Sequence, residues 1–269
     1  MPKIARANGT RSNRFLHNDP ADLARVLKEA RPYSFALVCV DGVYSMGGDL
    51  PPLRELAAVA NDNDAVLYVD DAHGTGVLGE HGRGTVLKAL GTYDNTLVIG
   101  SLSKAFSCFG GFIGCSAAMQ VQLKIRSNSY VFGGPVPPPY LDAICTVVDI
   151  LKSPEYSRLR AALDRNLQRL TMGATALGLN VIGGSTPIIS ILVGDEGDTL
   201  KAGKFLFDQG YYVQSVLFPA VPYRAGVLRI QVNSNHTAAE LTGLLEALRA
   251  LTKEIRLPGP APAQRSLAA

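Results

Sequence analysis

The sequence of 269 residues lacks long apolar runs, a strong net charge and cysteine pairs. No stretch is apolar for the roughly 20 residues that a membrane-spanning helix requires, and residues 1–10 lack the apolar region of a signal peptide. These absences favour a cytoplasmic protein. With 26 Lys and Arg against 23 Asp and Glu, the net charge of +3 is too small to suggest a nucleic-acid or membrane surface. A small-molecule partner is the better expectation.

Cysteine is also scarce. The four cysteines form no C-x-x-C pair and lie in apolar or small-residue segments: Cys39, Cys108, Cys115 and Cys145. We therefore expect reduced, buried thiols, with neither a disulfide framework nor a zinc site. The chain nevertheless has the balance of a globular protein, because 47% of its residues are hydrophobic and 18% are charged.

The first half of the chain alternates short apolar runs with helical patterns, which is typical of β-α units in a mostly parallel sheet. A helix over residues 51–61 begins with prolines and shows apolar spacing of three and four. Because parallel sheets bind ligands outside the carboxyl ends of their strands, functional residues are expected at those ends. Three runs predict buried strands that each end in polar or glycine residues: 35–40, 65–69 and 95–99.

The pattern changes near Ser153 and Pro154, where we place a domain boundary. Before it, the sequence predicts a strand at 110–115, a helix at 119–126, a turn-rich run at 132–139 and a long helix. After it, helices at 155–177, 199–209 and 238–255 and strands at 188–193 and 227–232 predict a compact α+β domain. Thr237 is the expected N-cap of the last helix, with Glu240 as its capping-box partner.

We therefore expect an α/β chain made of two domains and a tail. Residues 1–152 would form a large α/β domain and residues 153–257 a smaller α+β domain. Residues 258–269 are rich in proline and alanine and are predicted to be disordered.

Lys104 lies just beyond the third predicted strand, between Ser101 and Ser103 on one side and Ala105-Phe106 on the other. A lysine is usually a solvated surface charge. Here the apolar and small neighbours suggest an amine partly withdrawn from water, whose lowered pKa would suit a Schiff-base nucleophile near neutral pH. The nearby hydroxyls would be able to bind a phosphate.

Asp70 directly follows the second predicted strand and begins the run Asp-Asp-Ala-His-Gly-Thr-Gly. A carboxylate at this place can keep a pyridinium nitrogen protonated and so strengthen a cofactor as an electron sink. His73 would then point into the same crevice. The alternatives are an ordinary Asx turn, or a metal site formed with Asp71. Metal is disfavoured, because the remaining histidines show no spacing that would add a ligand.

Two further residues are weaker candidates. Ser45 follows the first strand and would be able to bond ring substituents of a cofactor, although a turn serine is the simpler interpretation. Arg229 interrupts the apolar strand at 227–232 and is either a surface residue or a clamp for a substrate carboxylate. The glycine-rich run at 79–84 lacks the ending of a P-loop and the spacing G-x-G-x-x-G, so it indicates a tight loop only.

Several motifs follow one another along the chain: Phe15-Leu-His-Asn-Asp, Asp41-Gly-Val-Tyr-Ser-Met-Gly-Gly-Asp-Leu-Pro-Pro-Leu, Asp70-Asp-Ala-His-Gly-Thr-Gly, Gly100-Ser-Leu-Ser-Lys-Ala-Phe, Pro137-Pro and Leu228-Arg-Ile. Taken together and in this order, they resemble the α-oxoamine synthases, a family of fold-type I pyridoxal-phosphate enzymes. The motifs are most similar to those of its 8-amino-7-oxononanoate synthase and glycine C-acetyltransferase members. The resemblance begins where family members have already used about a third of their length, so we expect a partial large domain.

The resemblance implies pyridoxal 5'-phosphate as cofactor and assigns roles to the candidates. Lys104 would hold the cofactor as a Schiff base and move the substrate's α-proton, with Asp70 at the pyridine nitrogen. His73 and Ser45 would contact the ring's phenolic oxygen. Ser101 would bind the phosphate and Arg229 the amino-acid carboxylate.

The implied reaction is a decarboxylative condensation of an amino acid with an acyl thioester, either acyl-CoA or acyl carrier protein, in a homodimer. Two other readings stay open. The chain would be a non-catalytic or partner-dependent subunit if a second polypeptide must complete its pocket. It would be an aminotransferase if the same fold serves transamination.

Overall fold

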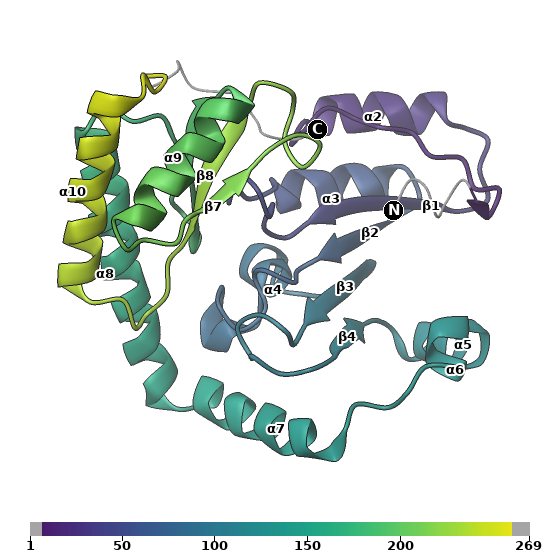
Figure 1. The fold of residues 1–269 in the computed structure, drawn as a ribbon. Helices are drawn as coiled ribbons and strands as arrows, with labels where there is room; N and C mark the ends of the chain where they lie inside the picture. The colour runs from purple at the N-terminus through teal and green to yellow at the C-terminus, as the bar shows by residue number, and fades with distance from the viewer. Residues whose placement is uncertain (1–6, 260–269) are drawn as a thin grey trace.

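The computed structural model describes residues 7–259 and contains two four-stranded sheets. The strand order is β1-β2-β3-β4 in the first sheet and β5-β6-β8-β7 in the second. A long helical connection, α7 (Pro138–Lys152) followed by α8 (Pro154–Ala176), leads from the first sheet to the second (Figure 1). The two helices meet at Ser153, whose side chain accepts a hydrogen bond from the Glu155 amide and so caps α8.

The first sheet is mostly parallel, as the alternating sequence pattern predicts. Strands β1, β2 and β3 run parallel, and β4 pairs with β3 in the opposite direction. Each predicted strand is present within one or two residues of its expected bounds. The bounds are β1 (Ala36–Asp41), β2 (Ala65–Asp70), β3 (Thr96–Ser101) and β4 (Gly111–Gly114).

One face of this sheet packs against α2 (Pro20–Glu29) and α3 (Leu53–Asp62), which lie together in Figure 1. Helix α3 corresponds to the predicted crossover helix. The sequence reading missed α2, although Asp19 caps it and Pro20 opens it. The shared core consists of Leu23, Leu27, Val38, Val40, Leu53, Leu56, Ala60, Ala65, Leu67, Val69, Val86 and Val98.

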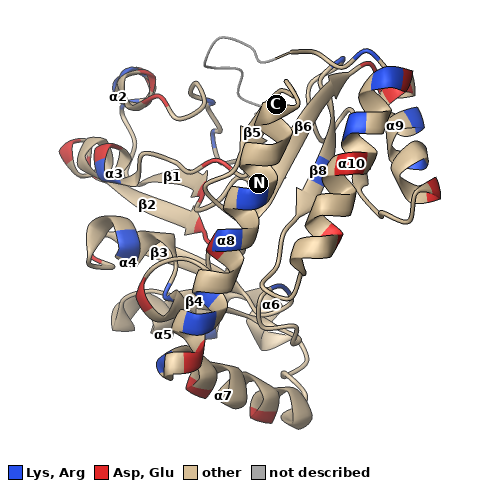
Figure 2. Cartoon of the chain, turned by 90° about the vertical axis from the view of Figure 1, so that its left-hand side faces the viewer, with Lys and Arg blue, Asp and Glu red and all other residues tan. Residues whose placement is uncertain are grey.

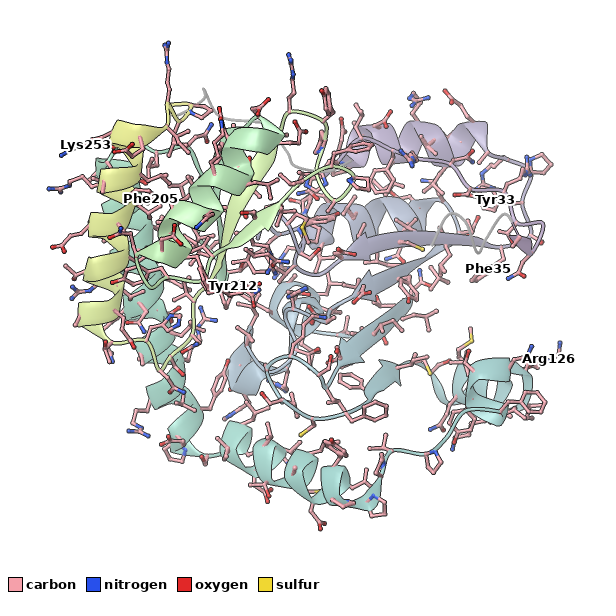
Figure 3. The ribbon with its side chains drawn as sticks, viewed as in Figure 1. Tyr33, Phe35, Arg126, Phe205, Tyr212 and Lys253 are labelled. Atoms are coloured by element: carbon pink, nitrogen blue, oxygen red, sulfur yellow. The ribbon has the colours of Figure 1, made fainter. Side chains whose placement is uncertain are left out.

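The connection between β2 and α7 contains short helices. The 3-10 helix η1 (Glu80–Gly82) and α4 (Thr85–Leu90) lead to β3. After β4, α5 (Ala117–Arg126) and α6 (Asn128–Val131) pack on each other. In the described part of the chain, none of the helices α5, α6 and α7 contains a buried residue. Arg126 of α5 and Phe35, just before β1, both lie at the right-hand edge of Figure 3.

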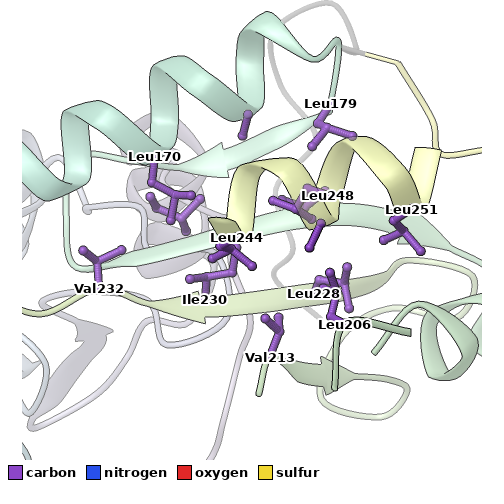
Figure 4. Close-up of a cluster of buried hydrophobic side chains, with 14 of the residues drawn as sticks. Leu170, Leu179, Leu206, Val213, Leu228, Ile230, Val232, Leu244, Leu248 and Leu251 are labelled. Atoms are coloured by element: carbon purple, nitrogen blue, oxygen red, sulfur yellow. The ribbon is translucent and has the colours of Figure 1, made fainter. Parts of the chain in front are cut away.

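The second sheet is antiparallel and forms the larger core of the molecule. Leu170 of α8 and Leu248 and Leu251 of α10 pack over Leu228 and Ile230 of β8 (Figure 4). Each such buried leucine contributes about 1.5–3 kcal/mol. The elements are β5 (Val181–Gly183), β6 (Ile188–Gly194), α9 (Glu196–Asp208), β7 (Gln214–Val216), β8 (Gly226–Gln231) and α10 (Ala238–Glu254).

The predicted capping box at the start of α10 is confirmed. The Thr237 hydroxyl accepts from the Glu240 amide, and the Glu240 carboxylate accepts from the Thr237 amide. Of the predicted tail at 258–269, residues 260–269 lie outside the described part of the chain. Within residues 7–259, no helix combines the length and the apolar character needed to cross a membrane.

The cysteines are free thiols, but the expectation that all four are buried is wrong. Cys108 is buried, Cys115 is partly buried, and Cys39 and Cys145 are exposed. Cys39 lies in an apolar strand that is covered on one face only, which the strand sequence does not reveal.

Candidate active site

The carboxyl ends of the parallel strands bring acidic residues side by side. Asp41 at the end of β1 is in register with Asp70 at the end of β2, and Asp70 is in turn paired with Ile99 of β3. In Figure 2 acidic segments mark the ends of β1 and β2. This edge of the first sheet is therefore negatively charged.

The neighbouring Asp70 and Asp71 occupy different environments. Asp70 is half-buried, and its side chain accepts one local hydrogen bond from the Ala72 amide at 3.2 Å. Asp71 is 1% exposed and accepts hydrogen bonds from the Thr85 amide at 2.8 Å and the Thr85 hydroxyl at 2.7 Å. Asp71 therefore fastens the start of α4, and Asp70 is the carboxylate that remains available to a ligand.

Three glycines explain how Asp71 fits into the fold. A Cβ atom at Gly42, Gly74 or Gly84 would come within 3 Å of an Asp71 carboxylate oxygen, so a larger residue at any of them would displace the carboxylate. The sequence analysis assigned Gly84 to a tight loop, gave Gly42 and Gly74 no role of their own, and did not predict the partner that the three share. The signal was present in the motif, where glycines follow Asp41, His73 and Arg83.

Asp71 is also strained electrostatically. Burial raises its pKa to about 6, with a smaller contribution from Asp70, even though the two bonds from Thr85 act in the opposite direction. The fold is therefore less stable with the Asp71 carboxyl ionised than with it protonated. Among residues 7–259 there is no cluster of three His, Cys, Asp or Glu side chains placed to hold a metal ion.

His73 lies half-buried near the strand ends. Burial lowers its pKa to about 4, and the positive charges of Lys104 and Arg229 act in the same direction, while Asp70 opposes them. The charges of Lys104, Arg229 and Asp70 therefore all act on the His73 imidazole. The imidazole is consequently neutral at pH 7, with one nitrogen able to donate and the other able to accept a hydrogen bond.

Lys104 lies in the loop between β3 and β4. Leu102, Phe106 and Cys108 anchor this loop by packing against α7, while the residues between them face outward. Lys104 itself is exposed, so the expectation that its amine is partly withdrawn from water is wrong for the described chain. The Ser101 hydroxyl lies 2.9 Å from the Ser103 hydroxyl, which gives the loop two adjacent groups able to bind an anion.

Arg229 connects the second sheet to the first. It is 6% exposed, and its Nε donates to the Ser45 carbonyl oxygen at 2.6 Å. One terminal nitrogen donates to the Gln214 side chain at 3.3 Å. Arg229 is therefore not a surface residue, and burial lowers its pKa. The structure brings it to the loop that carries Ser45.

That loop is held by further bonds from the second sheet. The Ser190 hydroxyl donates to the Met46 carbonyl at 2.6 Å, and the Thr186 hydroxyl donates to the Gly48 carbonyl at 2.8 Å. Together with Arg229, these side chains fix the position of Ser45 relative to both sheets.

Sequence reasoning missed two groups near the site. Burial and the adjacent Asp70 raise the pKa of Asp41 to about 6, against the opposing influence of Lys104 and His17. His17 Nε2 lies 2.6 Å from Asp49 Oδ2, and its ring contacts Tyr44 edge-on. Because 32 residues separate His17 from Asp49, no local motif could have paired them.

A cavity of about 570 Å³ lies elsewhere, lined among others by Asp71, Arg83, Phe106, Phe112 and Leu151. Its lining includes none of the six candidate site residues. The functional site is therefore better located by the converging side chains at the strand ends than by this cavity.

Comparison with known proteins identifies the family. The model for the class I and II aminotransferases matches residues 1–248. The chain belongs to this family. The chain is 38% identical over 239 residues to an 8-amino-7-oxononanoate synthase of Marinobacter nauticus, covering 88% of this chain and 60% of the relative. It is equally similar, over 245 residues, to one from Treponema denticola, covering 90% and 61%.

This chain is also similar to solved structures of the same fold. The serine palmitoyltransferase of Sphingomonas wittichii matches with a TM-score of 0.85 and 29% identity over 91% of this chain and 61% of that chain. The 8-amino-7-oxononanoate synthase of Francisella tularensis, with a TM-score of 0.77 and 24% identity, covers 93% of this chain and 70% of its own and supports the fold. The expected fold-type I architecture is thus confirmed. The chain spans about 60% of the length of the curated relatives that it matches.

Proposed function

We propose that this chain carries the core of a pyridoxal 5'-phosphate site for the condensation of an amino acid with an acyl thioester. The observation that supports the proposal is that Asp70 ends β2 of a class I and II aminotransferase fold, that Arg229 of the second sheet reaches the Ser45 loop, and that the charges of Lys104, Arg229 and Asp70 all act on His73. The relatives named 8-amino-7-oxononanoate synthase and serine palmitoyltransferase support this reaction class over others that the fold serves.

The residues fit the cofactor by their chemistry. Lys104 has an accessible amine, and the adjacent Ser101 and Ser103 hydroxyls are suited to bind a phosphate group. Asp70, whose carboxylate is free of the Thr85 bonds that hold Asp71, would keep a proton on the pyridine nitrogen. Neutral His73 would donate to the ring's phenolic oxygen, and Ser45 would contact the same oxygen.

When bound, pyridoxal phosphate supplies an electron sink for negative charge at the α-carbon of the amino acid. Lys104 Nζ would take the proton from that carbon and later return one. Arg229, preorganised by its bonds to the Ser45 carbonyl and the Gln214 side chain, would orient the amino-acid carboxylate through its other terminal nitrogen. The overall reaction forms a carbon–carbon bond to the acyl carbon and releases the thiol and carbon dioxide.

We further propose that the functional unit is a homodimer in the cytoplasm, with acyl-CoA or acyl carrier protein as the thioester donor. A partner-dependent subunit is the alternative, supported by the exposure of Lys104. An aminotransferase is a further alternative, because the matching family model includes that activity.

The discriminating experiment supplies glycine, alanine or serine with acyl-CoA donors and pyridoxal phosphate, and measures carbon dioxide and free thiol. The proposal expects both products in equal amounts and their loss in Lys104→Ala. Keto-acid formation without carbon dioxide would establish transamination instead. Absence of every product from the chain alone, with activity after a second polypeptide is added, would establish a partner-dependent subunit.

A further inference from the structure

The last residues of β1 and β2 place two carboxyl groups side by side. Asp41 is in parallel register with Asp70, and neighbouring strands of a sheet lie about 4.8 Å apart. Because successive side chains of a strand point to opposite faces, each aspartate points away from the valine before it. Val40 and Val69 are buried under the helices that cover the first sheet, so both carboxyls lie on the opposite face. They form an adjacent pair at one end of the sheet (Figure 2).

Burial and charge act on this pair from several elements. Burial first, and then the negative charge of Asp70, raises the pKa of Asp41 to about 6. Asp49, in the loop after β1, acts in the same direction, while Lys104 and His17 oppose it. At pH 7 Asp41 is therefore mostly ionised, and its negative charge lies next to Asp70.

Two tyrosines complete the surroundings of the pair. Burial first, and then Asp41, raises the pKa of Tyr44. Burial first, and then Asp70, raises the pKa of Tyr68. Both phenols are neutral near pH 7, so they add no charge to the pair.

Stability does not explain an aspartate at position 41. Its pKa is raised from 3.8 to about 6, so the folded chain loses stability as Asp41 ionises with rising pH. An asparagine would have nearly the same shape without that cost. The charge of Asp41 acts instead on its neighbour in register, Asp70, which is half-buried and accepts one local hydrogen bond from the Ala72 amide.

An ionised carboxylate next to Asp70 strengthens the attraction of this place for a cation. At the effective dielectric of a protein, unit charges one strand spacing apart shift each other's titration by about one pH unit or more. The attractions of two carboxylates for one positive charge add to each other. A protonated nitrogen in contact with Asp70 would therefore keep its proton more firmly with Asp41 ionised than with Asp41 protonated.

We propose that Asp41 is a positioning residue that acts through Asp70: the two adjacent carboxylates together hold the protonated ring nitrogen of the cofactor, Asp70 by contact and Asp41 by its charge. The inference deepens the proposed function and rests on it for the identity of the nitrogen. The coupling between the two carboxyls is a property of the chain alone. The contribution of Asp41 is present above about pH 6, where this carboxyl is ionised, and is lost below it.

The first experiment follows the carboxyl carbon of Asp41 by NMR as a function of pH, in the full chain without cofactor. We expect a midpoint near 6. The midpoint should fall by about one pH unit in Asp70→Asn, which removes the neighbouring charge with little change in shape. The matched control is Asp142→Asn, which removes the same charge from an exposed position on α7 and should leave the midpoint unchanged. Circular dichroism checks that each variant folds.

The second experiment loads the chain with pyridoxal phosphate that carries an isotope-labelled ring nitrogen, and follows the chemical shift of that nitrogen with pH. The shift reports whether the nitrogen is protonated. We expect its midpoint to fall by about one pH unit in Asp41→Asn and to be unchanged in Asp142→Asn. Asp41→Glu keeps the charge and should keep most of the midpoint. A merely structural role of Asp41 would not move this midpoint.

Two results would overturn the inference alone. One is an Asp41 midpoint that is the same in Asp70→Asn as in the unchanged chain, because the two carboxyls would then not be coupled. The other is a cofactor that binds to Asp41→Asn with an unchanged midpoint of its ring nitrogen. Failure of the chain and every variant to bind the cofactor is a separate outcome, which refutes the proposed function and the role of Asp41 with it.

Discussion

The substitution Thr85→Val tests whether Asp71 stabilises the fold through its hydrogen bond from Thr85 rather than serving as a ligand-binding carboxylate. It removes the hydroxyl that donates to Asp71 at 2.7 Å and keeps the shape of a residue that is 4% exposed. A hydrogen bond to a charged group contributes about 1.5–3 kcal/mol, so we expect a loss of about 2 kcal/mol in the free energy of unfolding at pH 8.

The loss should depend on pH, because the pKa of Asp71 is raised to about 6. At pH 5 the carboxyl is mostly protonated, and the hydroxyl then bonds to a neutral group. Such a bond contributes about 1 kcal/mol, so the cost of Thr85→Val should fall by about half. The matched control is Thr96→Val, because the buried Thr96 hydroxyl donates to the uncharged Asp94 carbonyl at 3.0 Å.

The assay is urea unfolding of the chain and both variants at pH 5 and pH 8. We expect a pH-dependent cost for Thr85→Val and a smaller, constant cost for Thr96→Val. Equal costs for the two variants at pH 8, or a cost of Thr85→Val that does not change with pH, would refute the account of Asp71.

Three further predictions follow from the site. Asp41→Asn should stabilise the chain by about 2 kcal/mol at pH 8, and should have no such effect at pH 3.5, in urea unfolding. The reason is that the pKa of Asp41 is raised from 3.8 to about 6 in the fold, so the folded chain loses stability as the pH rises through this range. Equal effects at both pH values would contradict this. His73 should titrate near pH 4 by NMR, so its share of stability is present above pH 6.5 and lost toward pH 4; titration near 6.5 would place it in water. Gly74→Ala should lower the free energy of unfolding by about 2 kcal/mol or more in thermal unfolding, because its Cβ would meet the Asp71 carboxylate. Gly91→Ala should cost about 1 kcal/mol, because Gly91 has a positive φ but open space around it. The reverse order would contradict the packing around Asp71.

Sequence periodicity was sufficient for the regular elements with strong patterns. The apolar runs gave β1, β2 and β3, and Thr237 with Glu240 gave the start of α10, because both signals are local. Helix α2 was not predicted despite its Asp19-Pro20 start, because only two of its residues, Leu23 and Leu27, are buried. A ten-residue helix with two buried residues carries a weak periodic signal.

The site was predictable to the extent that strand ends identify it. Sequence position alone brought Asp70, Ser101 and Lys104 to the edge of one sheet. It could not distinguish the environment of Asp70 from that of Asp71, because the two are neighbours in sequence and differ only in their partner, Thr85. The partner lies 14 residues away, beyond the reach of a local motif.

The exposed side of strand β1 shows a second limit. An apolar strand such as β1 predicts burial on both sides, yet Leu37 and Cys39 are exposed. Sequence pattern reports what a strand is suited to contact, and the structure reports which of those contacts the chain provides.

The most direct test of the account is to locate the lysine that takes up pyridoxal phosphate. Purified chain is mixed with the cofactor, reduced with borohydride and mapped by peptide mass spectrometry. We expect the pyridoxyl group on Lys104, reduced labelling in Asp70→Ala, and little label on Lys201 and Lys204, which are exposed lysines of α9. Labelling spread evenly over the exposed lysines, with Lys104 no more modified than Lys201, would contradict the central claim.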